Sequence, residues 1–348
     1  MSADEEPAPD PASIMRLATS YWESQCFLTA NRLGVFEALG DGPKPADEVA
    51  RALALSPRPT RLLLKACVGL ELLLEDERGF RNHPSAQVFL VPGGVAYLGN
   101  AVRYGDDMWT PWTALAAALR EGTPRVATET YTGDDPEKTR NFVYGMHNRA
   151  MGIGMALVGM LDLSGRQHLL DVGGGPGTYA ALLTRANPGL RATVIDLPEV
   201  AALADEILTE MGAREQVEPL AGDYRETPWP TGIDAVLISG VFHRETEDTC
   251  REFIARAREA LAPGGLLAVA DVFTDAGGAT PVFAALFGLN MMLSAPDGGV
   301  HADADVAQWL EDAGFRSVDR RPFPPPMPHR VVTGVVARVG TGADAGVR

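Results

Sequence analysis

The chain has 348 residues, and 46 Asp and Glu against 30 Lys and Arg give a formal net charge of −16. This length is typical of two domains, and the hydrophobic share of 46% with a charged share of 22% excludes disorder as the main state. The acidic excess argues against a nucleic-acid partner, because the phosphates of a duplex would be repelled by the surface.

Neither the ends of the chain nor its cysteines indicate export. The N-terminal sequence MSADEEPAPDPA is acidic and rich in proline, unlike a secretory signal, and we expect residues 1–12 and 341–348 to be disordered tails. The three cysteines have neither the paired spacing of a zinc site nor the number of a disulfide framework. No apolar stretch reaches the roughly 18 residues of a membrane span, so we expect a cytoplasmic protein with no membrane partner.

Residues 13–100 are predicted to form a winged-helix domain. One helix begins near Pro45, a second covers Thr60–Leu70, and two short strands at Leu72–Asp76 and Phe80–His83 surround a turn. Two helices followed by a hairpin serve either DNA binding or dimerisation. The second helix is mostly apolar and offers too few polar side chains for a DNA groove, so we expect dimerisation.

Residues 101–160 are predicted to be a helical linker that lines the substrate pocket, and residues 161–340 an α/β domain. In this second half short strands alternate with helices, which predicts a mostly parallel, doubly wound sheet. Its predicted strands are His168–Val172, Ala192–Asp196, Val217–Ala221, Ala235–Ile238 and Leu266–Asp271. Arg316–Phe323 and Arg330–Val339 have no helix between them, so we expect them to add an antiparallel pair to that sheet.

A glycine-rich loop follows the first strand of this domain. Gly173, Gly175 and Gly177 allow a sharp turn and a close approach of a ligand, and the next helix offers free amides. The spacing differs from the Gly-x-Gly-x-x-Gly of dinucleotide-binding proteins, and Asp171 at the end of the strand would repel a diphosphate. A ligand that carries an ammonium and a sulfonium group suits this carboxylate.

Two more carboxylates follow the next two strands. Asp196 lies 19 residues beyond Gly177, well placed to accept hydrogen bonds from both hydroxyls of a ribose, and Asp223 is suited to an adenine amino group. The carboxyl ends of parallel strands meet at one edge of the sheet, so these acids form one predicted site. That cofactor site comprises Asp171, Gly173, Gly175, Gly177, Asp196, Leu197, Gly222, Asp223 and Tyr224.

Together with the Leu-Ala-Pro-Gly-Gly turn at 261–265, these motifs resemble the S-adenosylmethionine-dependent small-molecule O-methyltransferases of the plant caffeate and bacterial antibiotic type. The resemblance covers nearly the whole chain. It implies a Rossmann-like class I methyltransferase sheet, an N-terminal winged-helix dimerisation domain, a homodimer and S-adenosylmethionine as cofactor. It also implies that Asp171 and the glycines hold the methionine part, that Asp196 binds the ribose and that Asp223 lies near the adenine.

The same resemblance places the chemistry after the fourth strand. The family has His-Asp-Trp there, and its histidine deprotonates a substrate hydroxyl; this chain keeps His243 but continues with Arg244 and Glu245. Asp271 occupies the position of the acid that orients this base. Where a second acid is expected, before the next helix, this chain has His301.

Two interpretations of the histidine pair remain open. In the first, which we expect, His243 and His301 hold iron or zinc, the metal chelates a 2-oxo acid, and the β-carbon of its enolate takes the methyl group. This resembles the 2-oxo acid C-methyltransferases of the same family, and Arg125 or Arg149 would bind the carboxylate of the small-molecule acceptor. In the second, His301 caps its loop and His243 is the base of a metal-independent O-methyltransferase of a phenolic or polyketide natural product.

Two other classes of function are disfavoured. A transcriptional regulator that uses the winged helix conflicts with the acidic charge, and a nicotinamide dehydrogenase conflicts with the spacing of the glycines.

Overall fold

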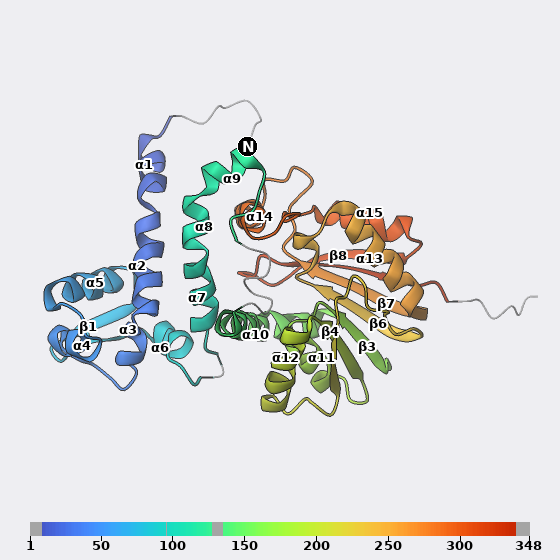
Figure 1. The fold of residues 1–348 in the computed structure, drawn as a ribbon, viewed down its shortest axis with the longest axis horizontal. Helices are drawn as coiled ribbons and strands as arrows, with labels where there is room; N and C mark the ends of the chain where they lie inside the picture. The colour runs from blue at the N-terminus through green and yellow to red at the C-terminus, as the bar shows by residue number, and fades with distance from the viewer. Residues whose placement is uncertain (1–8, 95, 127–134, 339–348) are drawn as a thin grey trace, which may run out of the picture. The chain divides into compact units, whose positions relative to one another are not determined.

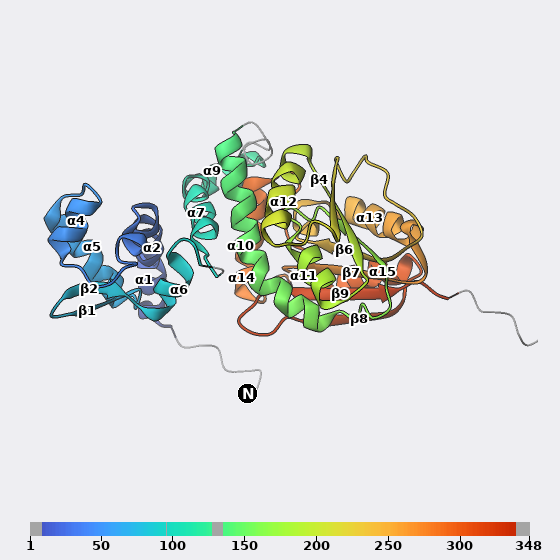
Figure 2. The ribbon, with the colours of Figure 1, turned by 90° about the horizontal axis from the view of Figure 1, so that it is seen from below.

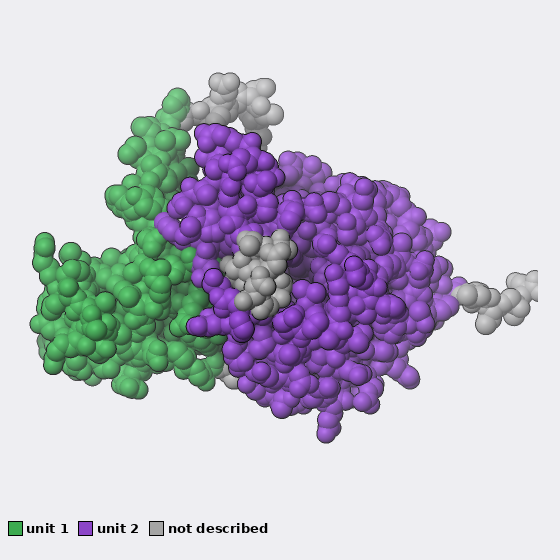
Figure 3. Space-filling view, viewed as in Figure 1, with its two compact units in different colours: residues 1–106 green, residues 107–348 purple. Residues whose placement is uncertain are grey.

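The computed structural model describes residues 9–94, 96–126 and 135–338. It divides into two compact units, residues 1–106 and residues 107–348 (Figure 3). The tail expected at 341–348 and most of the one at 1–12 lie outside the described residues. Helix α1 (Pro11–Thr19) begins within the latter, because the carboxylate of Asp10 accepts hydrogen bonds from two backbone N–H groups of its first turn.

The first unit is a helical domain with one β-hairpin (Figure 1). After α1 it contains α2 (Tyr21–Arg32), α3 (Val35–Ala38), α4 (Ala46–Ala52), α5 (Pro57–Gly69), β1 (Leu73–Asp76), β2 (Gly79–Asn82), α6 (Pro84–Leu90) and most of α7 (Gly99–Asp107). β1 and β2 pair antiparallel, so α4, α5 and the hairpin form the predicted winged-helix arrangement. Phe36, Leu64 and Phe80 are among the buried side chains of its core.

The second unit begins with helices α8 (Trp109–Thr113), α9 (Leu115–Glu121) and the long α10 (Pro136–Met160). α10 starts where the side chain of Asp135 accepts a hydrogen bond from the N–H of Lys138 and Pro136 occupies the first helical position. No helix in the described parts of the chain is both long enough and apolar enough to cross a membrane.

A seven-stranded mixed sheet forms the centre of the second unit, in the order β5-β4-β3-β6-β7-β9-β8. The strands are β3 (His168–Val172), β4 (Arg191–Asp196), β5 (Val217–Ala221), β6 (Ile233–Ser239), β7 (Leu261–Asp271), β8 (Arg316–Pro322) and β9 (Arg330–Val335). The first five are parallel, and β9 pairs antiparallel with both β7 and β8. The doubly wound sheet and its antiparallel pair are therefore confirmed.

Helices cover both faces of this sheet (Figures 1 and 2). α10, α11 (Thr178–Ala186) and α12 (Pro198–Glu210) pack on one face, and α13 (Glu247–Ala260) and α15 (Asp303–Asp312) on the other. Alternate residues of one strand serve the two layers: Leu267 belongs to the core beneath α13 and α15, and Ala268 to the core beneath α10 and α11.

The order of the strands reverses between β3 and β6, at the middle of the sheet. The chain leaves β3 for α11 on one face, and it leaves β6 for α13 on the other. A doubly wound sheet has its ligand crevice at such a point, outside the carboxyl ends of the strands. The short helix η2 (Phe242–Arg244), which follows β6, and the loop that follows β3 both lie at this edge.

Candidate active site

The loop after β3 is built around a buried acid. Asp171 is fully buried, and neither of its carboxylate oxygens has a hydrogen-bond partner among the described residues. Burial raises the pKa of Asp171 to about 8, and the nearby carboxylate of Asp196 acts in the same direction. A cationic ligand group placed against this buried carboxyl group would favour its ionised form, because the opposite charges attract.

The glycines of this loop are required by its geometry. Gly173, Gly175 and Gly177 have φ values of 61°, 54° and 71°, in the left-handed region that favours glycine. A Cβ atom on Gly174 would lie 2.6 Å from the carboxyl carbon of Asp171. The backbone therefore folds closely over the carboxyl group of Asp171. We call this backbone surface the glycine cradle, since a bound ligand needs such a close-fitting surface.

Hydrogen bonds to the carboxylate of Asp196 connect the loops after β3 and β4. One of its carboxylate oxygens accepts from the N–H of Gly175 and the other from the N–H of Leu197, both at 2.8 Å. Burial raises the pKa of Asp196 to about 6, and these two hydrogen bonds oppose the rise. Its backbone oxygen accepts from the N–H of Gly222 at 2.8 Å, which brings the loop after β5 to the same place.

The loop after β5 places Asp223 and Tyr224 at this edge. Asp223 accepts a hydrogen bond from the N–H of Arg225 at 2.8 Å, and the ring of Tyr224 lies within 3.3 Å of the Cβ that Gly173 lacks. The predicted cofactor residues of three consecutive strand ends are therefore close together in the structure.

His243 and Asp271 form a hydrogen-bonded pair at the ends of β6 and β7. Nδ1 of His243 lies 2.7 Å from one carboxylate oxygen of Asp271, and the backbone N–H of His243 donates to the other at 3.3 Å. Burial by itself would raise the pKa of Asp271, but attraction to His243 and its hydrogen bonds, including one from Val272, outweigh this and hold the pKa below its ordinary value. The ionised acid fixes the proton on Nδ1, which leaves Nε2 of His243 free to accept a proton.

An aromatic side chain borders His243. The ring of Phe287, in α14 (Val282–Ser294), meets the imidazole of His243 edge-on at 5.0 Å, and Phe283 stacks on Phe287 at 6.0 Å. His243 therefore has an apolar, planar neighbour on one side, and its side chain is 15% exposed.

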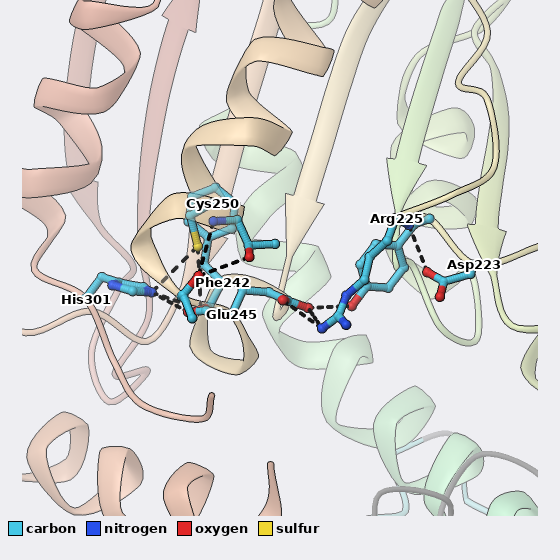
Figure 4. A network of polar contacts seen from close by, with 9 residues as sticks. Asp223, Arg225, Phe242, Glu245, Cys250 and His301 are labelled. Atoms are coloured by element: carbon cyan, nitrogen blue, oxygen red, sulfur yellow. Dashed lines mark hydrogen bonds and ion pairs between the residues drawn. The ribbon is translucent and has the colours of Figure 1, made fainter. Parts of the chain in front are cut away.

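His301 is not a partner of His243 at a metal site, and this expectation is wrong. Its Nε2 lies 3.1 Å from the backbone oxygen of Phe242 and 3.0 Å from that of Glu245 (Figure 4). Two carbonyl acceptors require a proton on Nε2, so this nitrogen has no lone pair for iron or zinc. Within residues 9–94, 96–126 and 135–338, no three His, Cys, Asp or Glu side chains are grouped to hold a metal ion.

Arg244 and Glu245, which follow His243 where the family has Asp-Trp, differ in burial, because Arg244 is partly exposed and Glu245 is buried. Glu245 is 3% exposed and forms a two-pronged ion pair with Arg225 at 2.7 and 2.8 Å, and it also accepts from the hydroxyl of Tyr224 at 3.1 Å (Figure 4). Sequence reasoning missed this network. The absence of Asp-Trp after His243 indicated that this position differs from the family. No pattern in the sequence, however, connects Glu245 to Arg225.

The two arginines nominated for the acceptor differ in their partners. The guanidinium of Arg125 lies 2.9 Å from the carboxylate of Glu121, but its buried Nε and Nη2 have no hydrogen-bond partner among the described residues. Arg149 is half-buried in α10 and has no ion-pair partner in the described parts of the chain. Burial lowers the pKa of His329 to about 4, and the charge of Arg149 acts in the same direction, so these two groups share one environment. Like the ion pair of Glu245 with Arg225, His329 is a neighbour of the site that was not predicted from the sequence.

Comparison with known proteins gives a consistent result over the whole chain. Residues 112–316 match the model of an O-methyltransferase domain, and residues 15–92 match that of an O-methyltransferase dimerisation domain. The chain is 34% identical to 3-hydroxy-5-methyl-1-naphthoate 3-O-methyltransferase from Streptomyces sahachiroi, over 94% of this chain and 96% of that protein. It is 33% identical to the tetracenomycin polyketide synthesis 8-O-methyltransferase of Streptomyces glaucescens, over 89% and 92% of the two chains.

Other similar proteins extend the range of acceptors. The N,N-dimethyltransferase OxyT of Streptomyces rimosus is 33% identical over 89% of this chain and 92% of its own. The crystal structure of human N-acetylserotonin methyltransferase in complex with S-adenosylmethionine superposes with a TM-score of 0.86, at 26% identity, over 97% of this chain and 100% of that one.

These relatives also correct the expected reaction. We expected C-methylation at the β-carbon of a 2-oxo acid, and the named relatives methylate oxygen or, in one case, nitrogen. With Nε2 of His301 bound to two carbonyls, the two-histidine metal site on which that expectation depended is absent from the described residues.

Proposed function

Because this chain belongs to the family of S-adenosylmethionine-dependent O-methyltransferases, we propose that it methylates a hydroxyl oxygen of a small phenolic or polyketide molecule in natural-product biosynthesis. The observation that carries this proposal is the pairing of His243 with the buried, ionised Asp271 at the carboxyl edge of the sheet. That pair supplies a base, and a hydroxyl is the acceptor group that needs one.

In the proposed reaction His243 takes the proton of the acceptor hydroxyl on Nε2. Asp271 stabilises the imidazolium that forms and keeps its ring in place through the hydrogen bond to Nδ1. The resulting phenolate oxygen is the nucleophile. When bound, S-adenosylmethionine would supply an electrophilic methyl group on a positively charged sulfur, and neutral S-adenosylhomocysteine would be the leaving group.

The acids at the three strand ends are proposed to hold this cofactor. Asp171, with two carboxylate oxygens that have no partner in the described structure, suits the positively charged methionine part. Asp196, with each carboxylate oxygen holding only one hydrogen bond, retains acceptor capacity for ribose hydroxyls. Asp223 is proposed to accept from the adenine amino group. Together with the glycine cradle over Asp171, these groups fit the cofactor that the family uses.

Arg125 and Arg149 are both candidates for a ligand carboxylate. Two buried nitrogens of Arg125 have no hydrogen-bond partner among the described residues, although Glu121 lies 2.9 Å away. The charge of Arg149 acts on His329, as that of His243 does. A planar guanidinium binds a carboxylate through two parallel hydrogen bonds. We also propose that the chain is a homodimer, formed through the dimerisation domain at residues 15–92.

The test is an assay of methyl transfer with trideuteromethyl-labelled S-adenosylmethionine. The acceptor probes are 3-hydroxy-5-methyl-1-naphthoate and N-acetylserotonin, and the position of the label is read by mass spectrometry and NMR. We expect label on oxygen and a loss of turnover of about 10²- to 10⁴-fold in His243→Gln. Label on carbon, or unchanged turnover in His243→Gln, would contradict the proposal.

Methylation of an amine is the second candidate, because OxyT is among the relatives. An amine with a free lone pair needs less help from a base than a hydroxyl does. Amine methylation that survives His243→Gln, with no product from either hydroxyl probe, would favour this alternative.

A further inference from the structure

The catalytic turn, which we define as residues 242–245, has little support of its own. It is a single turn of 3₁₀ helix, in which the N–H of Arg244 donates to Val241 at 2.9 Å and the N–H of Glu245 donates to Phe242 at 3.1 Å. Such turns have poorer hydrogen-bond geometry than an α-helix and are used only in short pieces. The direction of the His243 side chain therefore depends on what holds this backbone from outside.

The segment 299–301 meets the carbonyl groups of this turn from outside. The N–H of Gly299 donates to the backbone oxygen of His243 at 2.9 Å. Nε2 of His301 lies within 3.1 Å of the backbone oxygens of Phe242 and Glu245, as Figure 4 shows. Three of the four carbonyl groups of the turn are thus bound by a segment that is more than fifty residues away in sequence.

His301 is itself held firmly. Its backbone oxygen accepts from the N–H of Thr274 at 3.0 Å, and its ring meets Trp309 edge-on at 5.2 Å. Two residues further on, the buried carboxylate of Asp303 pairs with Arg320 at 3.2 Å and Arg330 at 2.6 Å. The segment that carries the donor is therefore anchored to β8 and β9, and β9 pairs with β7, the strand that ends in Asp271.

We propose that His301 is a positioning residue, whose Nε2–H donates to the two carbonyl groups that flank His243, those of Phe242 and Glu245. These contacts hold the backbone of the turn, so that Nε2 of His243 stays directed at the acceptor. The inference rests on the proposed role of His243 as base. Asp271 fixes the rotation of the imidazole ring and accepts from the backbone N–H of His243, and His301 holds the carbonyl groups on either side of that residue. His301 touches neither the acceptor nor the cofactor in this assignment.

Three variants separate this role from general stability. His301→Leu removes the donor but keeps an apolar side chain against Trp309. His301→Gln keeps a donor, because an amide nitrogen can give one proton to each carbonyl. His168→Leu is the matched control, since His168 also has a hydrogen-bonded ring, 3.0 Å from Thr193, but lies at the amino end of β3.

Hydrogen exchange of the amides of Arg244 and Glu245 needs no acceptor and tests the positioning directly. We expect about 10-fold faster exchange in His301→Leu, near wild-type exchange in His301→Gln, and no change in His168→Leu. Unchanged exchange in His301→Leu would overturn the inference.

Turnover of 3-hydroxy-5-methyl-1-naphthoate or N-acetylserotonin supplies the functional readout. A displacement of about 1 Å at a reacting group costs up to 10²-fold, so we expect kcat to fall about 10- to 100-fold in His301→Leu and to recover to within about fivefold of wild type in His301→Gln. The Kd for S-adenosylhomocysteine should stay within about twofold, and the double variant with His243→Gln should be no worse than His243→Gln alone.

The two proposals fail in different ways. If His243→Gln keeps wild-type kcat, the base assignment fails, and the exchange data still decide whether His301 holds the turn. If His243→Gln is inactive but His301→Leu keeps wild-type kcat, only the positioning role is overturned.

Discussion

One hydrogen bond determines which nitrogen of His243 is available to the acceptor. Asp271 is buried and ionised, its oxygen lies 2.7 Å from Nδ1, and the N–H of Val272 donates to the same oxygen. An uncharged amide in place of this carboxylate would no longer stabilise the imidazolium and could donate to Nδ1, which would put the proton on the wrong nitrogen.

Asp271→Asn should therefore lower kcat by about 10²- to 10⁴-fold. Calorimetric binding of S-adenosylhomocysteine should be unchanged, because the pair is assigned to the acceptor and not to the cofactor. Asp205→Asn, which removes an exposed ion pair with Arg214, is the control and should keep wild-type activity. Activity of Asp271→Asn within threefold of wild type would refute the assignment.

Asp171 links cofactor binding to pH. Burial raises its pKa to about 8, above the value of about 3.9 in an unfolded chain. The folded state thus keeps its proton while the unfolded state loses it, so the stability that this group contributes is complete below about pH 4 and is lost as the pH rises toward 8. A bound cation favours the ionised form and should displace the proton.

We predict that S-adenosylhomocysteine, which carries an ammonium group, releases a proton when it binds at pH 7. Calorimetry in buffers of different ionisation enthalpy measures this release. Asp171→Asn should abolish it, weaken binding by at least about 10-fold, and raise the melting temperature of the cofactor-free chain at pH 8. Equal heats in all buffers for the wild-type chain would show that Asp171 does not titrate on binding.

Among the elements, the turn after β6 connects the proposed acceptor side of the site to the proposed cofactor side. Glu245 contributes its backbone oxygen to His301 and its carboxylate to Arg225 and Tyr224, which follow Asp223 in the loop after β5 (Figure 4). The guanidinium of Arg225 is about half exposed, so solvent weakens this ion pair, but the carboxylate of Glu245 is buried and depends on it.

Glu245→Gln should consequently loosen the loop that carries Asp223. We expect the Kd for S-adenosylhomocysteine to rise about 3- to 10-fold, a larger effect than on kcat, because the loss of one charge-assisted pair costs about 1 kcal/mol when one partner is exposed. Glu247→Gln, which breaks the exposed pair with Arg251, is the matched control and should change neither. A fall in kcat alone would place Glu245 with His301 and not with the cofactor loop.

Local patterns were sufficient for the strands and for the acids that follow them. His168–Val172, a largely buried strand, and Val217–Ala221, an only partly buried edge strand, were predicted with the observed bounds, because a glycine of the following turn comes directly after each of them. The role of His301 was not predictable in this way. Its partners are carbonyl oxygens, which every residue possesses, so no residue type in the sequence marks them as acceptors.

For the molecule as a whole, the acidic charge and the fold agree with a small cationic cofactor. Within the described residues of the first unit, however, the apolar side chains of α1 are left uncovered. No residue of α1 is buried, although Ile14, Met15 and Leu17 are apolar and each more than 60% exposed. An isolated helix of this length is marginal in water, and its stability normally comes from an apolar face that packs on something. Because residues 15–92 match an O-methyltransferase dimerisation domain, we expect a second copy of this domain to cover the apolar side chains of α1.

Trp22, in the next helix α2, is 61% exposed, and large aromatic side chains dominate the energetics of interfaces. Trp22→Glu should therefore weaken association by about 2 kcal/mol or more, which raises the dimer Kd by at least about 30-fold. Light scattering after size exclusion should show a dimer for the wild type and a monomer for the variant at micromolar concentration. Leu62→Glu, at a leucine of α5 that is 64% exposed, is the control and should remain dimeric. If Trp22→Glu is dimeric and Leu62→Glu is monomeric, the interface lies on α5 and α1 must be covered in another way.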